Sequence, residues 1–253
     1  MKTLLAKHRS IRKFRSEPIA PEVLQDMLEA ASRASTCGNM QLYSLIVTQS
    51  RELREALAPC HFNQPMVTQA PCVITVCADV HRFSMWCEQR DAEPCYDNFA
   101  WFLNGVTDAL LAAQNLCVEA EAHGLGICYL GTTIYTAEEI ARILDLPKGV
   151  IPVTTIVVGH PDESPELTDR LPLDAVVHCE KYHHYTSSEI DELWAEKETS
   201  EETRRLLEEN GLPNLAQIFT RNRYRAEDNL AISRNYFALL KNCLLYTSDA
   251  ADD

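Results

Sequence analysis

The stretch from Trp101 to Ala122 constrains the fold of this chain more than any other feature. It is typical of a helix, and apolar residues occupy nearly every side of that helix. A helix that is apolar all round must be covered on all sides. We therefore expect a long helix over residues 97–123 that lies either at the centre of a large core or between two subunits. Its polar interruptions are Asn104, Asp108, Gln114, Asn115, Glu119 and Glu121.

Apolar runs alternate with helical patterns along the rest of the chain. The run 72–78 is apolar almost throughout, as in strands that are buried on both faces. Because the strands are few, the pattern favours an α+β fold over a large parallel sheet. We expect a capping box at Thr136 and Glu139. The predicted strands are 42–48, 72–78, 127–130 and 153–158, and the other predicted helices are 21–34, 51–57, 187–210 and 226–241.

The character of the sequence changes after Pro161. Residues 1–161 carry the strands and are predicted to form the core, whereas 162–242 read as a turn-rich and helical C-terminal excursion. Residues 243–253 resemble the translation of a transposase sequencing adapter. We therefore expect this last segment to be a non-native tail that frays.

Composition narrows the class of protein. A net charge of −14 argues against nucleic-acid or anionic-membrane partners, because the overall field repels phosphate. The sequence contains no uncharged apolar run of about 18 residues, so we expect no membrane-spanning helix. The N-terminal segment becomes basic where a signal peptide has its apolar region, so we do not expect a signal peptide. None of the ten cysteines forms a Cys-x-x-Cys pair, and several lie in apolar runs, as in reduced cytoplasmic proteins. His183 and His184 are adjacent, a spacing that does not favour a metal site.

A basic segment, residues 8–15, stands out in this acidic chain. Arg9 and Arg12 can each present a forked set of donors to phosphate oxygens, and Ser10 adds a hydroxyl. Ile11 and Phe14 could anchor the segment against the core. The alternative is a solvated basic terminus that pairs with acidic surface groups.

Other candidate sites are weaker taken singly. The glycines of 124–131 allow close approach of backbone amides to an anion, but they do not match the dinucleotide fingerprint. The polar loop 35–41 offers amides and hydroxyls to the edge of a flat heterocycle. Arg221, Arg223 and Arg225 form a second basic cluster, which either receives a phosphate or is simply exposed. No nucleophile elbow is present, and nothing identifies a catalytic side chain.

In combination, these motifs resemble the flavin-dependent nitroreductase family. They are His8-Arg9-Ser10-Ile11-Arg12-x-Phe14, Gly105-Val106-x-Asp108-Ala109 with Gln114-Asn115, Gly124-Leu125-Gly126-x-x-Tyr129-Leu130-Gly131, Gly159-x-Pro161 and Arg170-Leu171-Pro172. The likeness covers residues 8–177 and is greatest to the NADPH-dependent branch of oxygen-insensitive nitroreductases and flavin reductases.

The resemblance implies a central, mostly antiparallel sheet flanked by helices, in an intertwined homodimer with one FMN in each of two interface sites. The helices of 162–242 would complete the dimer and the cofactor cleft. The branch often has Lys at the position of Thr168, two residues before Arg170. The hold on FMN that the resemblance implies there is therefore weaker, but it is not removed. The implied FMN contacts are His8, Arg9, Ser10, Arg12, Ser35, Thr36, Gln41, Gln64, Leu130, Gly131 and Arg170, and Arg223 and Arg225 are candidates for NADPH.

The implied activity is hydride transfer from NADPH to flavin N5 and onward to nitroaromatic, quinone or flavin acceptors in a ping-pong cycle. The cofactor performs the hydride chemistry, and the protein supplies orientation and electrostatics. Two alternatives stay open. One is a non-enzymatic flavin-binding or regulatory protein on the same fold, and the other is a phosphate-binding protein without flavin.

Overall fold

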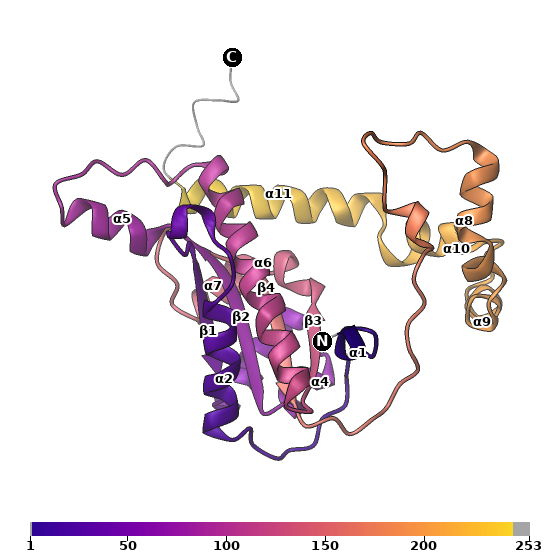
Figure 1. The fold of residues 1–253 in the computed structure, drawn as a ribbon, viewed down its shortest axis with the longest axis horizontal. Helices are drawn as coiled ribbons and strands as arrows, with labels where there is room; N and C mark the ends of the chain where they lie inside the picture. The colour runs from indigo at the N-terminus through magenta and orange to yellow at the C-terminus, as the bar shows by residue number, and fades with distance from the viewer. Residues whose placement is uncertain (1, 245–253) are drawn as a thin grey trace. The chain divides into compact units, whose positions relative to one another are not determined.

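The computed structural model describes residues 2–244, in two compact units. The first unit comprises 2–166 with 232–244, and the second comprises 167–231. Figure 1 shows the elements in chain order. The first unit contains α1 (Lys2–Leu5), α2 (Pro21–Ser32), η1 (Cys37–Asn39), β1 (Tyr43–Thr48), α3 (Arg51–Leu57), η2 (Ala58–His61), α4 (Pro65–Gln69), β2 (Cys72–Asp79), α5 (His81–Glu88), α6 (Phe99–Ala122), β3 (Gly126–Leu130), η3 (Gly131–Tyr135), α7 (Ala137–Ile143) and β4 (Val150–Gly159). The second contains η4 (Leu173–Ala175), α8 (Ser187–Thr199), α9 (Glu201–Asn210), α10 (Leu215–Ile218) and η5 (Phe219–Arg223), and α11 (Ala226–Cys243) runs from it into the first.

One four-stranded sheet organises the first unit. Its order is β1-β2-β4-β3, and every neighbouring pair is antiparallel. All eight residues of β2 are buried, as expected for a strand covered on both faces. The α+β fold with an antiparallel sheet is therefore confirmed.

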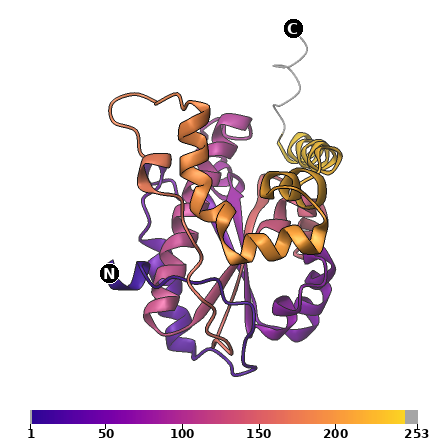
Figure 2. The same ribbon diagram turned by 90° about the vertical axis from the view of Figure 1, so that its right-hand side faces the viewer.

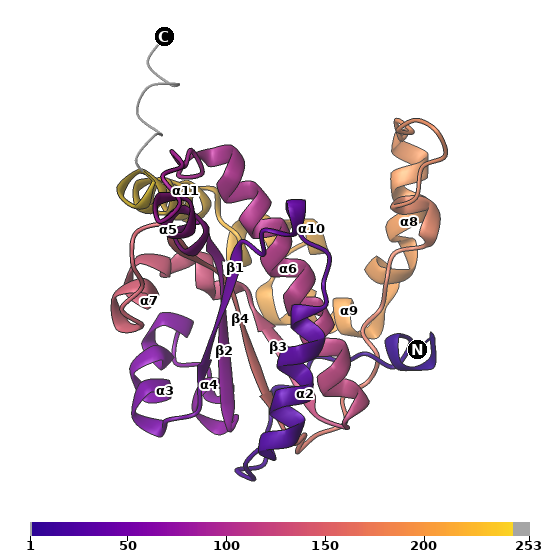
Figure 3. The same cartoon turned by 60° about the vertical axis from the view of Figure 1, so that its left-hand side comes forward.

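Helices cover both faces of the sheet (Figures 2 and 3). Alternation along β2 sends Ile74 toward α2 and α6, and Val73 toward α3, α4 and α7. The apolar helix α6 packs on the first face, where Ala109, Ala112 and Leu116 are fully buried.

The predicted helix and strand positions agree with the structure within a few residues in most cases. Ser50 caps α3, since its hydroxyl accepts a hydrogen bond from the Leu53 amide. The capping box at Thr136 is wrong, because its hydroxyl donates to the Cys60 carbonyl at 2.7 Å. The predicted helix 187–210 is two helices, which Ser200 separates by capping α9.

The end of α11 belongs to the core of the first unit. Leu239, Leu240 and Leu244 are buried beside Phe102 and Ile151. Of the segment predicted to be a non-native tail, residues 243 and 244 are thus described, and 245–253 lie outside the described residues. No helix of residues 2–244 is long and apolar enough to cross a membrane.

Candidate functional site

The basic segment runs beside strand β3. Ser10 forms a parallel bridge with Ile127, and the Ile11 amide donates to the Ile127 carbonyl at 2.9 Å. Ile11 and Phe14 are buried, so they anchor the segment as predicted. A side chain at Gly126 would stand 2.6 Å from Ile11 Cγ1, so this close approach requires glycine. The anchors leave the basic side chains on the outside of the core.

The side chains of this segment have unequal partners. His8 Nδ1 lies 2.6 Å from Glu121 Oε1, so this histidine is already engaged. Glu163 accepts hydrogen bonds from the amides of Arg12 and Lys13. Arg9 Nη1 donates to the Lys7 carbonyl at 3.2 Å, but Arg9 Nε is buried without a partner. A buried guanidinium donor without an acceptor is costly, and an anion is the acceptor that suits it.

A cavity of about 770 Å³ brings Arg12 and Gln64 together. Lys13 and Arg15 add cationic groups to its lining, and Asp162 adds an acidic group. Phe14 and Met66 provide part of its apolar wall. The cavity therefore combines local positive charge with apolar surface, in a molecule that is acidic overall.

Gly131 follows β3 and opens onto free space. A Cβ atom added at Gly131 would meet nothing within 4 Å. Leu130 itself is buried, at the end of β3. The next residue, Thr132, bonds to His61 in η2 at 2.8 Å, and η2 leads directly to Gln64. Arg12 and Gln64 thus line one cavity, and the Gln64 amide bonds to His61, whose ring contacts Thr132 next to Gly131.

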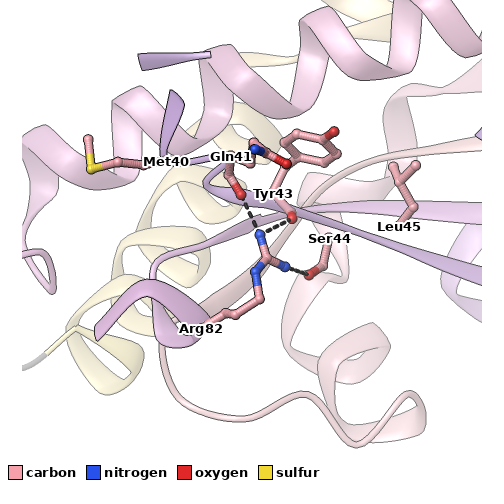
Figure 4. Close-up of a pocket in the computed structure, with 6 residues that line it drawn as sticks. All are labelled: Met40, Gln41, Tyr43, Ser44, Leu45 and Arg82. Atoms are coloured by element: carbon pink, nitrogen blue, oxygen red, sulfur yellow. Dashed lines mark hydrogen bonds between the residues drawn. The ribbon is translucent and has the colours of Figure 1, made fainter. Parts of the chain in front are cut away.

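Two charged side chains hold the polar loop 35–41. The buried Asp108 carboxylate accepts from the Cys37 amide at 2.9 Å and from the Leu42 amide at 3.1 Å. Arg82 donates to the carbonyls of Gln41 and Tyr43 (Figure 4). Asn39 and Gln41 have a left-handed backbone conformation, which residues other than glycine rarely adopt. The bonds from Asp108 and Arg82 hold the loop in this conformation.

Arg82 is itself fixed by the ends of β1 and β2. Its guanidinium donates to Ser44 Oγ at 3.2 Å and to Asp79 Oδ2 at 3.3 Å. Gln41 and Arg82 line an open cavity of about 430 Å³ beside Met40 and Tyr43 (Figure 4). The side chain of Gln41 is therefore accessible to a ligand.

The loop 35–41 and the basic segment lie far apart within one chain. Asp108 holds the loop and Glu121 holds His8, and both residues are on α6. Thirteen residues of α-helix separate them, which corresponds to about 20 Å. The structure thus places the basic segment with His8, Arg9, Ser10 and Arg12 beside β3, whose end carries Leu130 and Gly131, and it places Arg12 with Gln64 in one cavity. Ser35, Thr36 and Gln41 lie on a loop away from the basic segment.

Three further predicted contacts belong to the second unit. Arg170 is exposed, and its Nη1 donates to the carbonyls of Thr168 and Asp169. Arg223 lies over the Phe219 ring at 5.5 Å. Arg225 pairs with Asp228 at 2.7 Å and with Glu227 at 2.9 Å, so its charge is locally compensated.

Sequence reasoning missed the two residues that hold the loop. Asp108 interrupts the apolar part of α6, and that interruption is the signal that could have identified it. Arg82 lies on α5, a helix that apolar periodicity did not predict. Among residues 2–244, no group of three or more His, Cys, Asp or Glu side chains could hold a metal ion.

Comparison with known proteins supports the resemblance seen in the motifs. A model of the nitroreductase family matches residues 5–101 and 58–160. An NADPH-dependent oxidoreductase of Staphylococcus aureus is 36% identical over 184 residues, which cover 71% of this chain and 73% of that protein.

Solved structures agree over nearly the whole chain. A crystal structure of a Bacteroides fragilis protein matches with a TM-score of 0.94 and 47% identity, covering 95% of this chain and 98% of that one. The NADPH:FMN oxidoreductase of Vibrio harveyi, solved with NAD+, matches with a TM-score of 0.74 and 26% identity, covering 93% and 96%. On the family model and the relative together, this chain belongs to the nitroreductase family.

Proposed function

We propose that the chain is an FMN-dependent oxidoreductase that passes hydride from NADPH to nitroaromatic, quinone or flavin acceptors in a ping-pong cycle. Its class, an NAD(P)H-dependent oxidoreductase with FMN, rests on the family and on the relatives named above. The single observation that carries the cofactor site is the buried Arg9 Nε without a protein acceptor.

The residues around β3 fit the phosphate end of FMN. Arg9 and Arg12 supply cationic donors, and Ser10 supplies a hydroxyl next to them. The 2.6 Å contact with Glu121 keeps His8 in place at the edge of this group. The local positive charge overcomes the repulsion that a net charge of −14 exerts on a phosphate, because the contacts act at short range.

The rest of the chain's contribution is binding and orientation. FMN, when bound, supplies the hydride chemistry, so no side-chain nucleophile or general acid is needed. Gln64 lines the cavity beside Arg12, and Gly131 leaves room for a ring to approach its backbone. Ser35, Thr36 and Gln41 offer polar groups to the ring, but from a loop about 20 Å away.

This separation leads us to propose a homodimer in which a second copy supplies the loop 35–41 to each site. The face of α6 that carries Leu103, Leu110 and Leu111 is exposed in one chain. These positions lie on one stripe of the helix, as at a helix–helix interface. Burial of this stripe by a second copy would cover the side of α6 that the first chain leaves open.

The proposal includes a preference for NADPH over NADH, which requires a cationic side chain for the 2′-phosphate. Arg223 is the better of the two candidates for the 2′-phosphate, because two acids already compensate Arg225. We also place the protein in the cytoplasm, since the buried free thiols Cys72, Cys77 and Cys117 suit a reducing compartment.

An absorbance spectrum followed by stopped-flow reduction tests the proposal. The purified protein should carry bound flavin, which NADPH bleaches faster than NADH and which a quinone reoxidises. The double substitution Arg9→Ala with Arg12→Ala should weaken FMN binding by about 3–6 kcal/mol, since each charged contact contributes about 1.5–3 kcal/mol. Arg51→Ala with Arg205→Ala, at two exposed arginines that pair with acids on their own helices, is the matched control.

Each contrary result has a distinct meaning. A protein that never binds FMN excludes the function. One that binds FMN but is not reduced by either nucleotide is a non-enzymatic flavin protein. Full flavin retention in the Arg9 and Arg12 variant contradicts the phosphate assignment.

A further inference from the structure

His61 is a buried histidine with a half-satisfied ring. Its side chain is fully buried in η2, and its Nδ1 lies 2.8 Å from Thr132 Oγ1. Its Nε2 is buried without a hydrogen-bond partner. Burial lowers the pKa of His61 to about 4, so the imidazole is neutral at neutral pH.

The missing partner of Nε2 fixes the direction of the His61–Thr132 hydrogen bond. A neutral imidazole has one N–H, and a buried N–H without an acceptor is costlier than a bare lone pair in an apolar site. The proton therefore resides on Nδ1, and Nδ1 donates to Thr132 Oγ1. Within residues 2–244, Thr132 Oγ1 makes no other side-chain hydrogen bond, so its own hydroxyl hydrogen is left free to donate.

The same contact links the two loop segments that flank the candidate site. Thr136 Oγ1 donates to the Cys60 carbonyl at 2.7 Å, and the rings of Phe62 and Tyr135 lie 6.0 Å apart. We call these contacts and the His61–Thr132 bond the η2–η3 junction. The Gln64 amide donates to the His61 carbonyl at 3.1 Å, and Gly131 immediately precedes Thr132. The junction thus sets the spacing between Gln64 and Gly131.

We propose that Thr132 is a further hydrogen-bond donor to the bound flavin and that His61 is the positioning residue that aims its hydroxyl. The inference rests on the proposed function, because it assigns Thr132 to the flavin site proposed beside Gly131. His61 occupies one lone pair of Thr132 and thereby orients the remaining O–H. The imidazole itself stays buried and does not touch the ligand.

FMN titration of the apoprotein, followed by flavin fluorescence quenching, tests this assignment. Thr132→Val and His61→Leu should each weaken FMN binding about three- to tenfold, the usual range for one hydrogen bond. Thr132→Ser keeps the hydroxyl, and His61→Asn places an amide N–H near the position of Nδ1, so both should bind within about twofold of wild type. The double variant Thr132→Val with His61→Leu should lose no more than Thr132→Val alone, because His61 acts through Thr132.

A spectroscopic signature separates positioning from a general structural effect. The visible absorption bands of bound FMN should shift in Thr132→Val and His61→Leu, and return in the Ser and Asn variants. Thr48→Val is the matched control, because Thr48 is a buried threonine on β1 whose hydroxyl has no partner. It should leave both the affinity and the bands unchanged.

Two outcomes overturn the inference in distinguishable ways. If Thr132→Val binds FMN with wild-type affinity and bands while Arg9→Ala with Arg12→Ala releases it, this assignment fails and the proposed function stands. If the wild-type apoprotein takes up no FMN, both fail. Should His61→Leu not fold, the half-buried Thr132 still decides the question through its Val and Ser variants.

Discussion

Asp108 shows how one buried carboxylate can determine the shape of a polar loop. It accepts two backbone hydrogen bonds, from Cys37 and Leu42, at the two ends of the polar loop. Asp108→Asn replaces one acceptor oxygen with an NH2 group that faces an N–H donor. We expect a loss of about 1.5–3 kcal/mol in the free energy of unfolding, the contribution of one hydrogen bond to a charged group.

Urea unfolding measures this effect, and Asp191→Asn on an exposed position of α8 is its control. Limited proteolysis should also cut the loop faster in the Asp108 variant. If both variants unfold at the same urea concentration, Asp108 does not hold the loop.

His61 makes a separate prediction about acid stability. Its folded-state pKa is about 4, whereas the unfolded value is near 6.5. Between these values the unfolded chain binds more protons, so stability is complete above pH 6.5 and declines as the pH falls toward 4. The difference corresponds to about 3 kcal/mol. His61→Leu should flatten the pH dependence of unfolding in this window, and an unchanged slope would show that His61 is already charged or exposed.

Among the elements, strand β3 places the basic segment. Gly126→Ala would put a Cβ atom 2.6 Å from Ile11 Cγ1, so Ile11 must move and the Ser10–Ile127 bridge must open. We expect a lower melting temperature for the apoprotein and weaker FMN binding. Gly131→Ala adds the same atom to open space, and should leave the apoprotein melting temperature within about 1 °C of wild type.

The pair of glycine variants also separates folding from binding. If Gly131 approaches the flavin as proposed, its alanine variant loses FMN affinity without losing stability. Equal melting temperatures for the two alanine variants would show that Ile11 moves aside easily, and that β3 does not fix the basic segment.

Local sequence patterns predicted most elements because those elements form from their own residues. The buried strand 72–78 and the helix from Pro21 follow from apolar periodicity alone. The predicted capping box at Thr136 was wrong because the Thr136 hydroxyl bonds instead to the Cys60 carbonyl, which lies far away in the sequence. The break at Ser200 was missed because capping there outweighs the helical propensity of the flanking charged residues.

At the scale of the whole molecule, the motifs indicated candidate site residues but not where these residues lie relative to one another. The basic segment and Gly131 were candidates from motifs, and the structure places the segment beside Ile127 of β3, the strand that Gly131 follows. The distance between the basic segment and the loop 35–41 depends on where each of them contacts the long helix α6. These contacts join residues far apart in the sequence, so no local pattern predicts them. That separation, rather than any motif, is the physical argument for a second copy.

The ten cysteines report on the integrity of the whole fold. Six of them are buried, and burial raises the pKa of Cys72, Cys77 and Cys117 to about 12. We therefore expect iodoacetamide to spare Cys60, Cys72, Cys77, Cys87, Cys117 and Cys128 in the native protein and to label all ten in urea, as counted by mass spectrometry. Exposed Cys95 is the internal control.

The rate at which the buried cysteines react carries the decisive information. Cys72 and Cys77 lie on the central strand β2, so their labelling requires opening of the sheet and should share one rate set by global unfolding. Both rates should rise together in Asp108→Asn, because that variant lowers the free energy of the same opening. If Cys72 or Cys77 reacts as fast as Cys95 under native conditions, the sheet is not covered on both faces, and the fold described here is wrong.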